Sequence, residues 1–282
     1  MRVIKTIREL RAELAKHRLK GSRIGLVPTM GALHSGHLSL VKASKKECEI
    51  TLVSIFVNPA QFNNKEDLEK YPNTIDRDIR LLEAEDCSIL FLPTIQEIYP
   101  NQHDISISFG QLETNLEGSF RPGHFQGVGL VVSKLFNVSQ PDAAFFGQKD
   151  LQQFFVIKKL IDQLSFPIDL KMVETSREEN GLAMSSRNLR LSNIDRSEAS
   201  IIYESLLIAK KQLLEGIAIQ NMIKNIKELF AANNRLELEY FEIVETDNFK
   251  SIKEVVDPKK TAICVAAIIG NVRLIDNLLL NY

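Results

Sequence analysis

The chain has 282 residues, 44% of them hydrophobic and 25% charged, so it can bury a sizeable core. Its formal net charge of −1 provides no basic excess for a nucleic-acid surface. No segment approaches the ~18 apolar residues that cross a bilayer, and residues 1–10 lack the apolar core of a secretory signal. We therefore expect a soluble, cytoplasmic protein that binds neither nucleic acid nor membranes.

The first two-thirds of the chain alternates between strand-like and helix-like segments. Short apolar runs predict strands, and amphipathic runs between them predict helices. In chain order, the strands are expected at 23–28, 50–57, 87–93, 142–147 and 167–173, and the helices at 36–48, 74–86, 124–139 and 149–164. This alternation predicts an α/β fold with a parallel, doubly wound, Rossmann-like sheet.

The pattern changes after about residue 173. Residues 174–192 are polar and predict a long loop, which is followed by helices at about 195–214 and 219–232. Strand-like runs then predict strands at 236–244, 261–269 and 272–278. We expect two domains, 1–178 and a smaller α+β domain at 179–282.

The three cysteines, Cys48, Cys87 and Cys264, lie far apart in the sequence. Their odd number and their spacing fit neither a disulfide framework nor a metal site. We expect reduced thiols that pack as small hydrophobic side chains.

The stretch PTMGALHSGHLSL places His34 and His37 where the first long strand gives way to a helix. In an open parallel sheet, ligands bind at the carboxyl ends of the strands, and a helix start favours phosphate. Gly31 and Gly36 allow the backbone to approach a ligand closely. The stretch is therefore a candidate nucleotide site, although taken alone it is equally compatible with a turn that bears two solvated imidazoles.

Two further motifs follow predicted strands. FVNPAQF carries Asn58 and Gln61, neutral amides that suit a hydroxyl or carboxylate ligand, but Asn-Pro is also an ordinary turn signal. FFGQKDLQQF places Lys149 and Asp150 after Gly147, at a helix start where a lysine opposes the helix dipole unless an anion binds nearby. A solvated lysine is the alternative.

Two more motifs lie in loops. GLAMSSRN carries Ser185, Ser186 and Arg187, two hydroxyls and a forked cation that suit triphosphate oxygens in a mobile loop. LEGSFRPGHFQGV carries Arg121 and His124 around a Pro-Gly turn. A simple linker and a structural turn remain the alternatives for these two motifs.

These motifs, together with RLIDN near the end of the chain, resemble in content and order those of the pantothenate synthetases (pantoate–β-alanine ligases). That family belongs to the nucleotidyltransferase superfamily, whose H-x-G-H signature matches residues 34–37. The resemblance spans about residues 27–278. It implies ATP-dependent condensation of (R)-pantoate with β-alanine to pantothenate, AMP and pyrophosphate through pantoyl adenylate, which is a step toward coenzyme A. It also implies a cytoplasmic homodimer that uses Mg²⁺ with ATP.

The resemblance assigns roles residue by residue. It implies that domain 1–178 binds ATP and pantoate and that domain 179–282 contributes a lid over the active site. The catalytic residues would be His34, His37, Lys149 and Arg187, with His37 as proton donor. The substrates would contact Asn58, Gln61, Arg121 and Gln153, with Gln61 reaching both acids, and Asp150 would help to hold the metal. The ATP-binding residues would be Met30, Gly31, Ala32, Leu33, His34, Ser35, Gly36, His37, Gly147, Gln148, Lys149, Asp150, Ser176, Met184, Ser185, Ser186 and Arg187.

The chain departs from the family at three positions of these motifs. The family commonly has glutamate at Gln148, a β-branched apolar residue near Ser176 and aspartate at Asn180. The rival enzyme is a cytidylyl- or adenylyltransferase that acts on a phosphorylated acceptor, which would need more basic groups than the two amide motifs supply. An aminoacyl-tRNA synthetase lacks support from charge, and a nucleotide-sensing module on the same fold is the non-enzymatic alternative.

Overall fold

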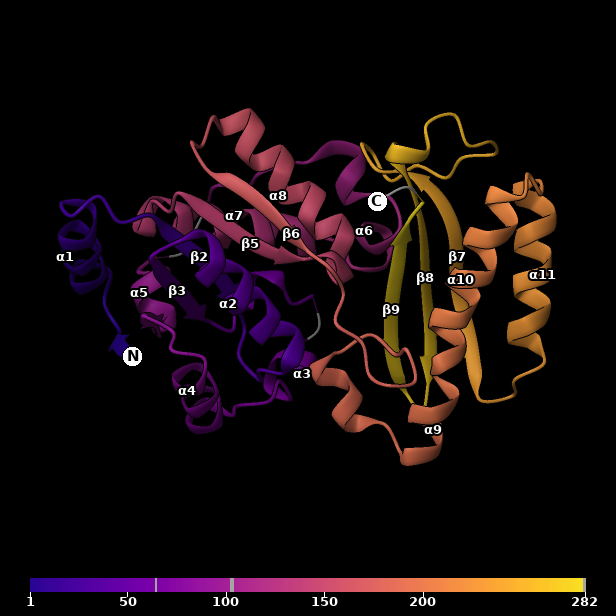
Figure 1. Ribbon diagram of the computed structural model, residues 1–282, viewed down its shortest axis with the longest axis horizontal. Helices are drawn as coiled ribbons and strands as arrows, with labels where there is room; N and C mark the ends of the chain where they lie inside the picture. The colour runs from indigo at the N-terminus through magenta and orange to yellow at the C-terminus, as the bar shows by residue number, and fades with distance from the viewer. Residues whose placement is uncertain (64, 102–103, 281–282) are drawn as a thin grey trace. The chain divides into compact units, whose positions relative to one another are not determined.

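The computed structural model describes residues 1–63, 65–101 and 104–280 (Figure 1). Its contacts divide the chain into two compact units. Unit 1 comprises Met1–Gly147 and Gln153–Val173, and unit 2 comprises Gln148–Gln152 and Glu174–Tyr282. Unit 2 thus begins a few residues before the expected domain boundary and also includes a short segment from within the first domain.

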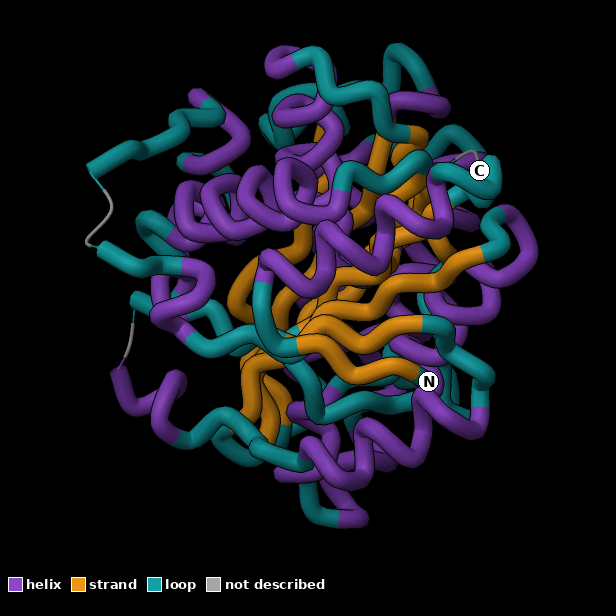
Figure 2. Tube along the Cα trace, turned by 90° about the vertical axis from the view of Figure 1, so that its left-hand side faces the viewer, coloured by secondary structure: helices purple, strands orange, loops and turns teal. Residues whose placement is uncertain are grey.

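Unit 1 is built on a parallel sheet that, in the described residues, has six strands in the order β1-β4-β3-β2-β5-β6. Helices lie on both faces of these strands (Figure 2). The strands are β1 (Arg2–Ile4), β2 (Ile24–Thr29), β3 (Ile50–Ile55), β4 (Ile89–Phe91), β5 (Ala143–Gly147) and β6 (Asp169–Val173). The helices are α1 (Ile7–Arg18), α2 (Ser35–Glu47), α3 (Lys65–Glu69), α4 (Ile75–Ala84), α5 (Ile95–Ile98), α6 (Glu117–Phe120), α7 (His124–Ser139) and α8 (Leu151–Leu164), the last of which starts in unit 2.

The central strands are buried because both faces of the sheet are covered. β2 pairs with β3 from Ile24↔Ile50 to Thr29↔Ile55, and helix α2 packs against both of them and against β5. Leu26, Val27 and Val53 are completely or almost completely buried, as expected for apolar runs in a parallel sheet.

Strand order reverses between β2 and β5, because the chain goes from β2 to β3 on one side and returns to β5 on the other. In an open α/β sheet such a reversal leaves a crevice at the carboxyl ends of the strands. The loops after β2 and β3 therefore start at the same edge of unit 1, where β2 lies beside β5, which ends at Gly147.

Unit 2 contains an antiparallel sheet with the order β7-β8-β9. Helices α10 and α11 lie along this sheet and enclose its apolar core (Figure 1). The elements are α9 (Asn193–Glu198), α10 (Ser200–Leu214), α11 (Ile219–Ala231), β7 (Leu236–Glu245), β8 (Thr261–Ile269) and β9 (Val272–Leu279).

The expected α/β architecture is confirmed, and the three cysteines are buried, as expected. The single helix expected at about 195–214 is instead two helices, α9 and α10, which meet at Ala199. Strand β1 and helix α1 were not expected from the sequence; β1 has only three residues, too few for a periodic pattern. The expected loop at 174–192 contains a short 3₁₀ helix, Ser186–Arg190.

Candidate active site

Two histidines cap helix α2 at the carboxyl end of β2. The His34 Nδ1 atom accepts a hydrogen bond from the Gly36 N–H at 3.2 Å, and the His37 Nδ1 atom accepts one from the His34 N–H at 3.3 Å. Their ring centroids are 4.1 Å apart. Because a backbone N–H points at each Nδ1, the proton of each neutral ring lies on Nε2. The capping box therefore gives both imidazoles an Nε2–H donor.

Helix α2 is also suited to an anion by its charge pattern. Its first turn contains no acidic residue, and Lys45 and Lys46 occupy its last turn. The N-terminal end of a helix carries a partial positive charge and unpaired N–H groups, which stabilise phosphate.

A buried aspartate fixes the loop between β2 and α2. The Asp78 side chain, from helix α4, accepts the N–H groups of Ala32 and Leu33, both at 2.9 Å, and the Thr74 hydroxyl at 3.1 Å. Gly31 and Ala32 have positive φ angles of 82° and 51°, a conformation that costs a residue with a side chain about 1–2 kcal/mol. The Asp78 carboxylate offsets this cost and determines where the loop places His34.

Asn58 lies inside unit 1 and is 1% exposed. Its amide nitrogen donates to the Gln61 Oε1 atom and to the Gly127 carbonyl, both at 3.1 Å. Its Oδ1 atom accepts from the Tyr99 hydroxyl at 2.8 Å and from the Ala60 N–H at 3.3 Å. Burial raises the pKa of Tyr99 from 10.0 to about 12, so its hydroxyl stays protonated and can donate even in moderately alkaline solution. These bonds use both donors of Asn58, which therefore orients the Gln61 amide.

Gln61 is held from three directions. Its Oε1 atom accepts from Asn58, as described above, and its Nε2 atom contacts the Met30 sulfur at 3.2 Å. Its backbone carbonyl oxygen lies 2.9 Å from the Nδ1 atom of buried His124. Helix α7 approaches this turn closely, because a Cβ atom at Gly127 would lie 2.2 Å from the Ala60 carbonyl oxygen. The Met30–Gln61 contact joins the loop after β2 to the turn after β3.

The remaining residues expected to contact substrates in unit 1 are Arg121 and Gln153. Arg121 is half-buried at the turn between α6 and α7, and Gln153 is half-buried in the first turns of α8. Their roles as substrate contacts stay predictions.

In unit 2, the loop with the GLAMSSRN motif folds back on itself as a hairpin. Arg177 and Ala183 form an isolated antiparallel bridge, and the Met184 N–H donates to the Ser176 carbonyl at 2.9 Å. Asn188 closes the base by donating to the Glu178 carboxylate at 2.8 Å and to the Ala183 carbonyl at 3.1 Å. Burial raises the pKa of Glu178, but the bonds from Arg196 and Asn188 outweigh that effect and lower it overall.

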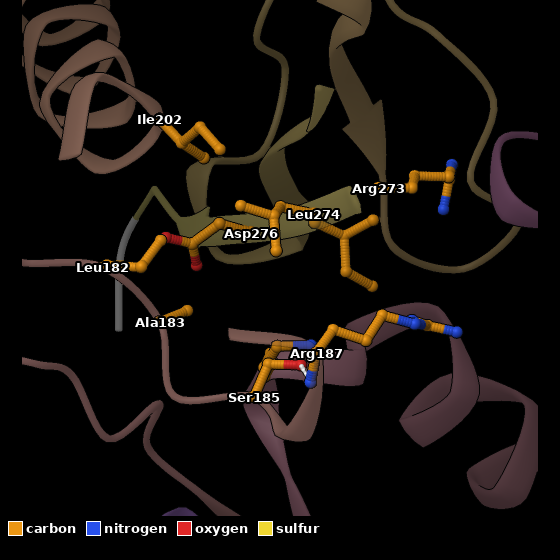
Figure 3. A pocket seen from close by; sticks show the side chains of 10 residues that line it. Leu182, Ala183, Ser185, Arg187, Ile202, Arg273, Leu274 and Asp276 are labelled. Carbon is orange, nitrogen blue, oxygen red and sulfur yellow. Dashed lines mark hydrogen bonds between the residues drawn. The ribbon is translucent and has the colours of Figure 1, made fainter. Parts of the chain in front are cut away.

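A pocket in unit 2 is lined by residues of this hairpin and by Lys149. Ser185 and Arg187 lie on one side of the pocket, and Leu274 and Asp276 on the other (Figure 3). The Lys149 ammonium is 3.8 Å from the Asp150 carboxylate, and these side chains are 18% and 54% exposed. The full lining consists of Lys149, Leu182, Ala183, Ser185, Arg187, Ile202, Arg273, Leu274, Ile275 and Asp276.

No cluster of three or more His, Cys, Asp or Glu side chains that could hold a metal occurs among the residues that the structure describes. Asp150 is the residue expected at the metal, and its half-exposed carboxylate fits an ion that takes most of its ligands from phosphates and water, as Mg²⁺ often does.

Several residues that shape these sites were missed from the sequence. They are Thr74, Asp78, Tyr99 and Gly127 in unit 1, and Arg177, Tyr203, Asp276 and Asn277 in unit 2. Each acts through another residue, so its role cannot be identified from a local motif, even where the residue lies within one, as Gly127 does. The RLIDN motif pointed to the last two residues without suggesting what they do.

The sequence matches the family described as pantoate-beta-alanine ligase over residues 2–279. It is 45% identical, over 278 residues and 98% of both chains, to the pantothenate synthetase of Cytophaga hutchinsonii. The pantothenate synthetase of Bacteroides fragilis is 44% identical over 278 residues, 99% of this chain and 98% of that one.

Two solved structures are similar over nearly the whole chain. One is the pantothenate synthetase of Thermus thermophilus, with a TM-score of 0.92, 38% identity and 99% of both chains covered. The other is the pantoate-beta-alanine ligase of Francisella tularensis in complex with Beta-gamma ATP and β-alanine, with a TM-score of 0.82 and 34% identity over 100% of this chain and 98% of that one. The chain therefore belongs to the pantoate–β-alanine ligase family.

Proposed function

We propose that the chain joins pantoate to β-alanine at the expense of ATP in two steps. A carboxylate oxygen of pantoate attacks the α-phosphorus, pyrophosphate leaves, and pantoyl adenylate forms. The β-alanine amine then attacks the activated carbonyl carbon, loses a proton and displaces AMP, which leaves an amide. The observation that carries the proposal is a histidine-capped helix start and an oriented amide, Gln61, in adjoining loops of unit 1.

The first step needs alignment and neutralisation of negative charge more than covalent help from the protein. His34 and His37 would donate through Nε2–H to phosphate oxygens, because their Nδ1 atoms are occupied by the capping bonds. His37 would also supply a proton to the departing phosphate; for that step its ring must be the imidazolium, which loses the Nε2 proton and returns to the neutral form. The N-terminal end of α2 adds a stabilising dipole at the same place.

Pantoate would be held by neutral amides. Gln61 and Gln153 would bond its carboxylate and hydroxyl groups, whereas the buried Asn58 would act by orienting Gln61. A cation beside the attacking carboxylate would reduce its nucleophilicity, which is a physical reason for amides here. Gln61 would also contact β-alanine.

ATP would be bound by Met30–His37, by Gly147–Asp150 and by Met184–Arg187, with Lys149 and Arg187 neutralising the developing charge. A backbone contact from Ser176 to adenine would tolerate the departure of its side chain from the family. Mg²⁺ would be held by the ATP phosphates and Asp150, and it would supply further neutralisation. A lid from the second domain, a homodimer and a cytoplasmic location remain predictions; the described residues include no helix that could cross a membrane.

The test is a pyrophosphate-release assay in which each acid is omitted in turn. The proposal predicts release that requires pantoate, and AMP with an amide product only when β-alanine is also present. Release with neither acid, or transfer of AMP to a phosphorylated acceptor, would favour the rival nucleotidyltransferase. Nucleotide binding without turnover under all these conditions would favour a sensing module.

A further inference from the structure

The RLIDN motif occupies Arg273–Asn277 on strand β9, and the proposed reaction leaves it without a role. Two neighbouring residues of the motif, Asp276 and Asn277, are polar and yet only 3% exposed. A buried polar side chain is stable only when its hydrogen bonds are made, so their partners indicate what they do.

Asn277 holds the turn that follows β5. Its side-chain amide donates to the carbonyl of Gln148 at 3.0 Å and to that of Lys149 at 2.9 Å, and its Oδ1 atom accepts from the Gln148 Nε2 atom at 3.4 Å. Both amide hydrogens are used. These bonds explain why Gln148–Gln152 groups with unit 2, although in the chain it lies between β5 and the rest of α8.

Asp276 holds the hairpin that leads to Ser185. Its oxygens accept from the Arg177 guanidinium at 2.6 and 3.1 Å, and one also accepts the Asn277 N–H at 2.8 Å. Arg177 in turn donates to the Gly181 carbonyl at 3.0 Å and lies 3.6 Å from the centroid of the Tyr203 ring. The strand of the hairpin that contains Arg177 is therefore held by the ion pair with Asp276, by the hydrogen bond to the Gly181 carbonyl and by stacking on Tyr203.

We infer that Asp276 and Asn277 are positioning residues that hold the two nucleotide-binding segments of unit 2, Gln148–Asp150 and Met184–Arg187, in a fixed relation to each other. This inference rests on the proposed function, because it takes those segments to bind ATP. The two side chains are neighbours on one strand, so a single rigid element carries both anchors. Charged groups fixed before the ligand arrives bind and stabilise phosphate better than groups that must be ordered on binding.

The test uses two nearly isosteric variants. Asn277→Asp keeps the size of the side chain but replaces both N–H donors with an oxygen that faces two carbonyl groups. Asp276→Asn removes the charge opposite Arg177. In each variant we expect the KM for ATP to rise tenfold or more and kcat to fall, with the KM for pantoate and for β-alanine changing less than twofold. Amide hydrogen exchange in 148–150 should be faster in Asn277→Asp.

A matched control separates positioning from general destabilisation. Ile226 is a core residue of α11, 1% exposed, and α11 packs mainly against β7 and α10, so Ile226→Val and Ile226→Ala supply comparable losses of melting temperature. If the variants raise the KM for ATP no more than an Ile226 variant of equal stability, the inference is wrong. If either variant does not fold, Tyr203→Leu decides, because it removes the ring stacked on Arg177 but keeps an apolar side chain against the core of unit 2. We expect a severalfold rise in its KM for ATP.

Failure of the proposed function would look different. In that case the wild-type chain would release no pyrophosphate with pantoate, whereas exchange at 148–150 would still respond to Asn277→Asp. Wild-type activity together with unchanged exchange and an unchanged KM for ATP in the variants would overturn the positioning role alone.

Discussion

Replacing Asp78 with asparagine removes one oxygen acceptor from the anchor beneath the His34 loop. One carboxylate oxygen accepts the Leu33 N–H and the Thr74 hydroxyl, and the other accepts the Ala32 N–H. The asparagine keeps two of the three bonds when its oxygen accepts from Leu33 and Thr74. Its NH₂ group then faces the Ala32 N–H. A buried donor is then left unsatisfied and faces another donor.

The magnitude follows from these bonds. An unsatisfied buried donor costs about 1–3 kcal/mol, and the two remaining bonds lose the strengthening that a charged acceptor supplies. We expect the free energy of unfolding to fall by about 2–4 kcal/mol, which lowers the melting temperature of a domain of this size by about 4–16 °C. Because the loop carries Ala32 at φ 51°, it should also relax and displace His34, so pyrophosphate release should fall tenfold or more.

Asp76 provides the control, since it is an exposed aspartate in the same first turn of α4. Asp76→Asn loses only a helix-dipole interaction of about 0.3–1 kcal/mol. Thermal unfolding and the pyrophosphate assay should be measured on both variants. If Asp78→Asn matched Asp76→Asn in melting temperature and rate, the anchoring role of Asp78 would be refuted.

Three further predictions concern the turn after β3 and the thiol of Cys87. Gln61→Ala should raise the KM for pantoate at least tenfold while leaving the Kd for ATP within about threefold, because the proposed function assigns the lost amide to pantoate. Equal loss of ATP affinity in a calorimetric titration would count against that role. Gly127→Ala should lower the free energy of unfolding by about 1–3 kcal/mol, since its Cβ atom would lie 2.2 Å from the Ala60 carbonyl oxygen. A stability equal to wild type in urea unfolding would show that α7 does not pack this closely against the turn after β3. Burial raises the pKa of Cys87 from 9.0 to about 11, so its protonated thiol contributes stability that is fully present below pH 9 and is lost between about pH 9 and 11, by about 2–3 kcal/mol. Urea unfolding at pH 8 and pH 11 should show a loss that is larger by this amount in wild type than in Cys87→Ala, in which Tyr99 still titrates, and equal losses in both would refute the assignment.

Most of the sheet of unit 1 could be predicted, because strands β2 to β5 are short apolar runs separated by amphipathic helices, and both patterns are local. The same is true of the loop containing His34 and His37, which lies directly after a strand. The capping box formed by the two imidazoles could not be predicted, because it depends on rotamers and on which ring nitrogen faces the backbone. The role of Asn58 was also hidden, since an Asn-Pro pair looks the same whether its amide meets a ligand or another side chain.

Residues that hold the site from distant positions in the sequence could not be predicted either. Asp78 lies 45 residues from Leu33, and Asn277 lies 128 residues from Lys149, so no periodicity or spacing connects them. Only the fold brings such residues together. The RLIDN motif pointed to the C-terminal strand, but its contacts were needed to give Asp276 and Asn277 a physical role.

The most direct measurement follows an oxygen atom. Pantoate labelled with ¹⁸O in its carboxylate is incubated with the enzyme, ATP, Mg²⁺ and β-alanine, and the products are analysed by mass spectrometry. If a carboxylate oxygen attacks the α-phosphorus, that oxygen leaves with AMP, so each AMP molecule carries one ¹⁸O and pyrophosphate carries none. Unlabelled AMP, or label in phosphate released together with ADP, would contradict an acyl-adenylate reaction.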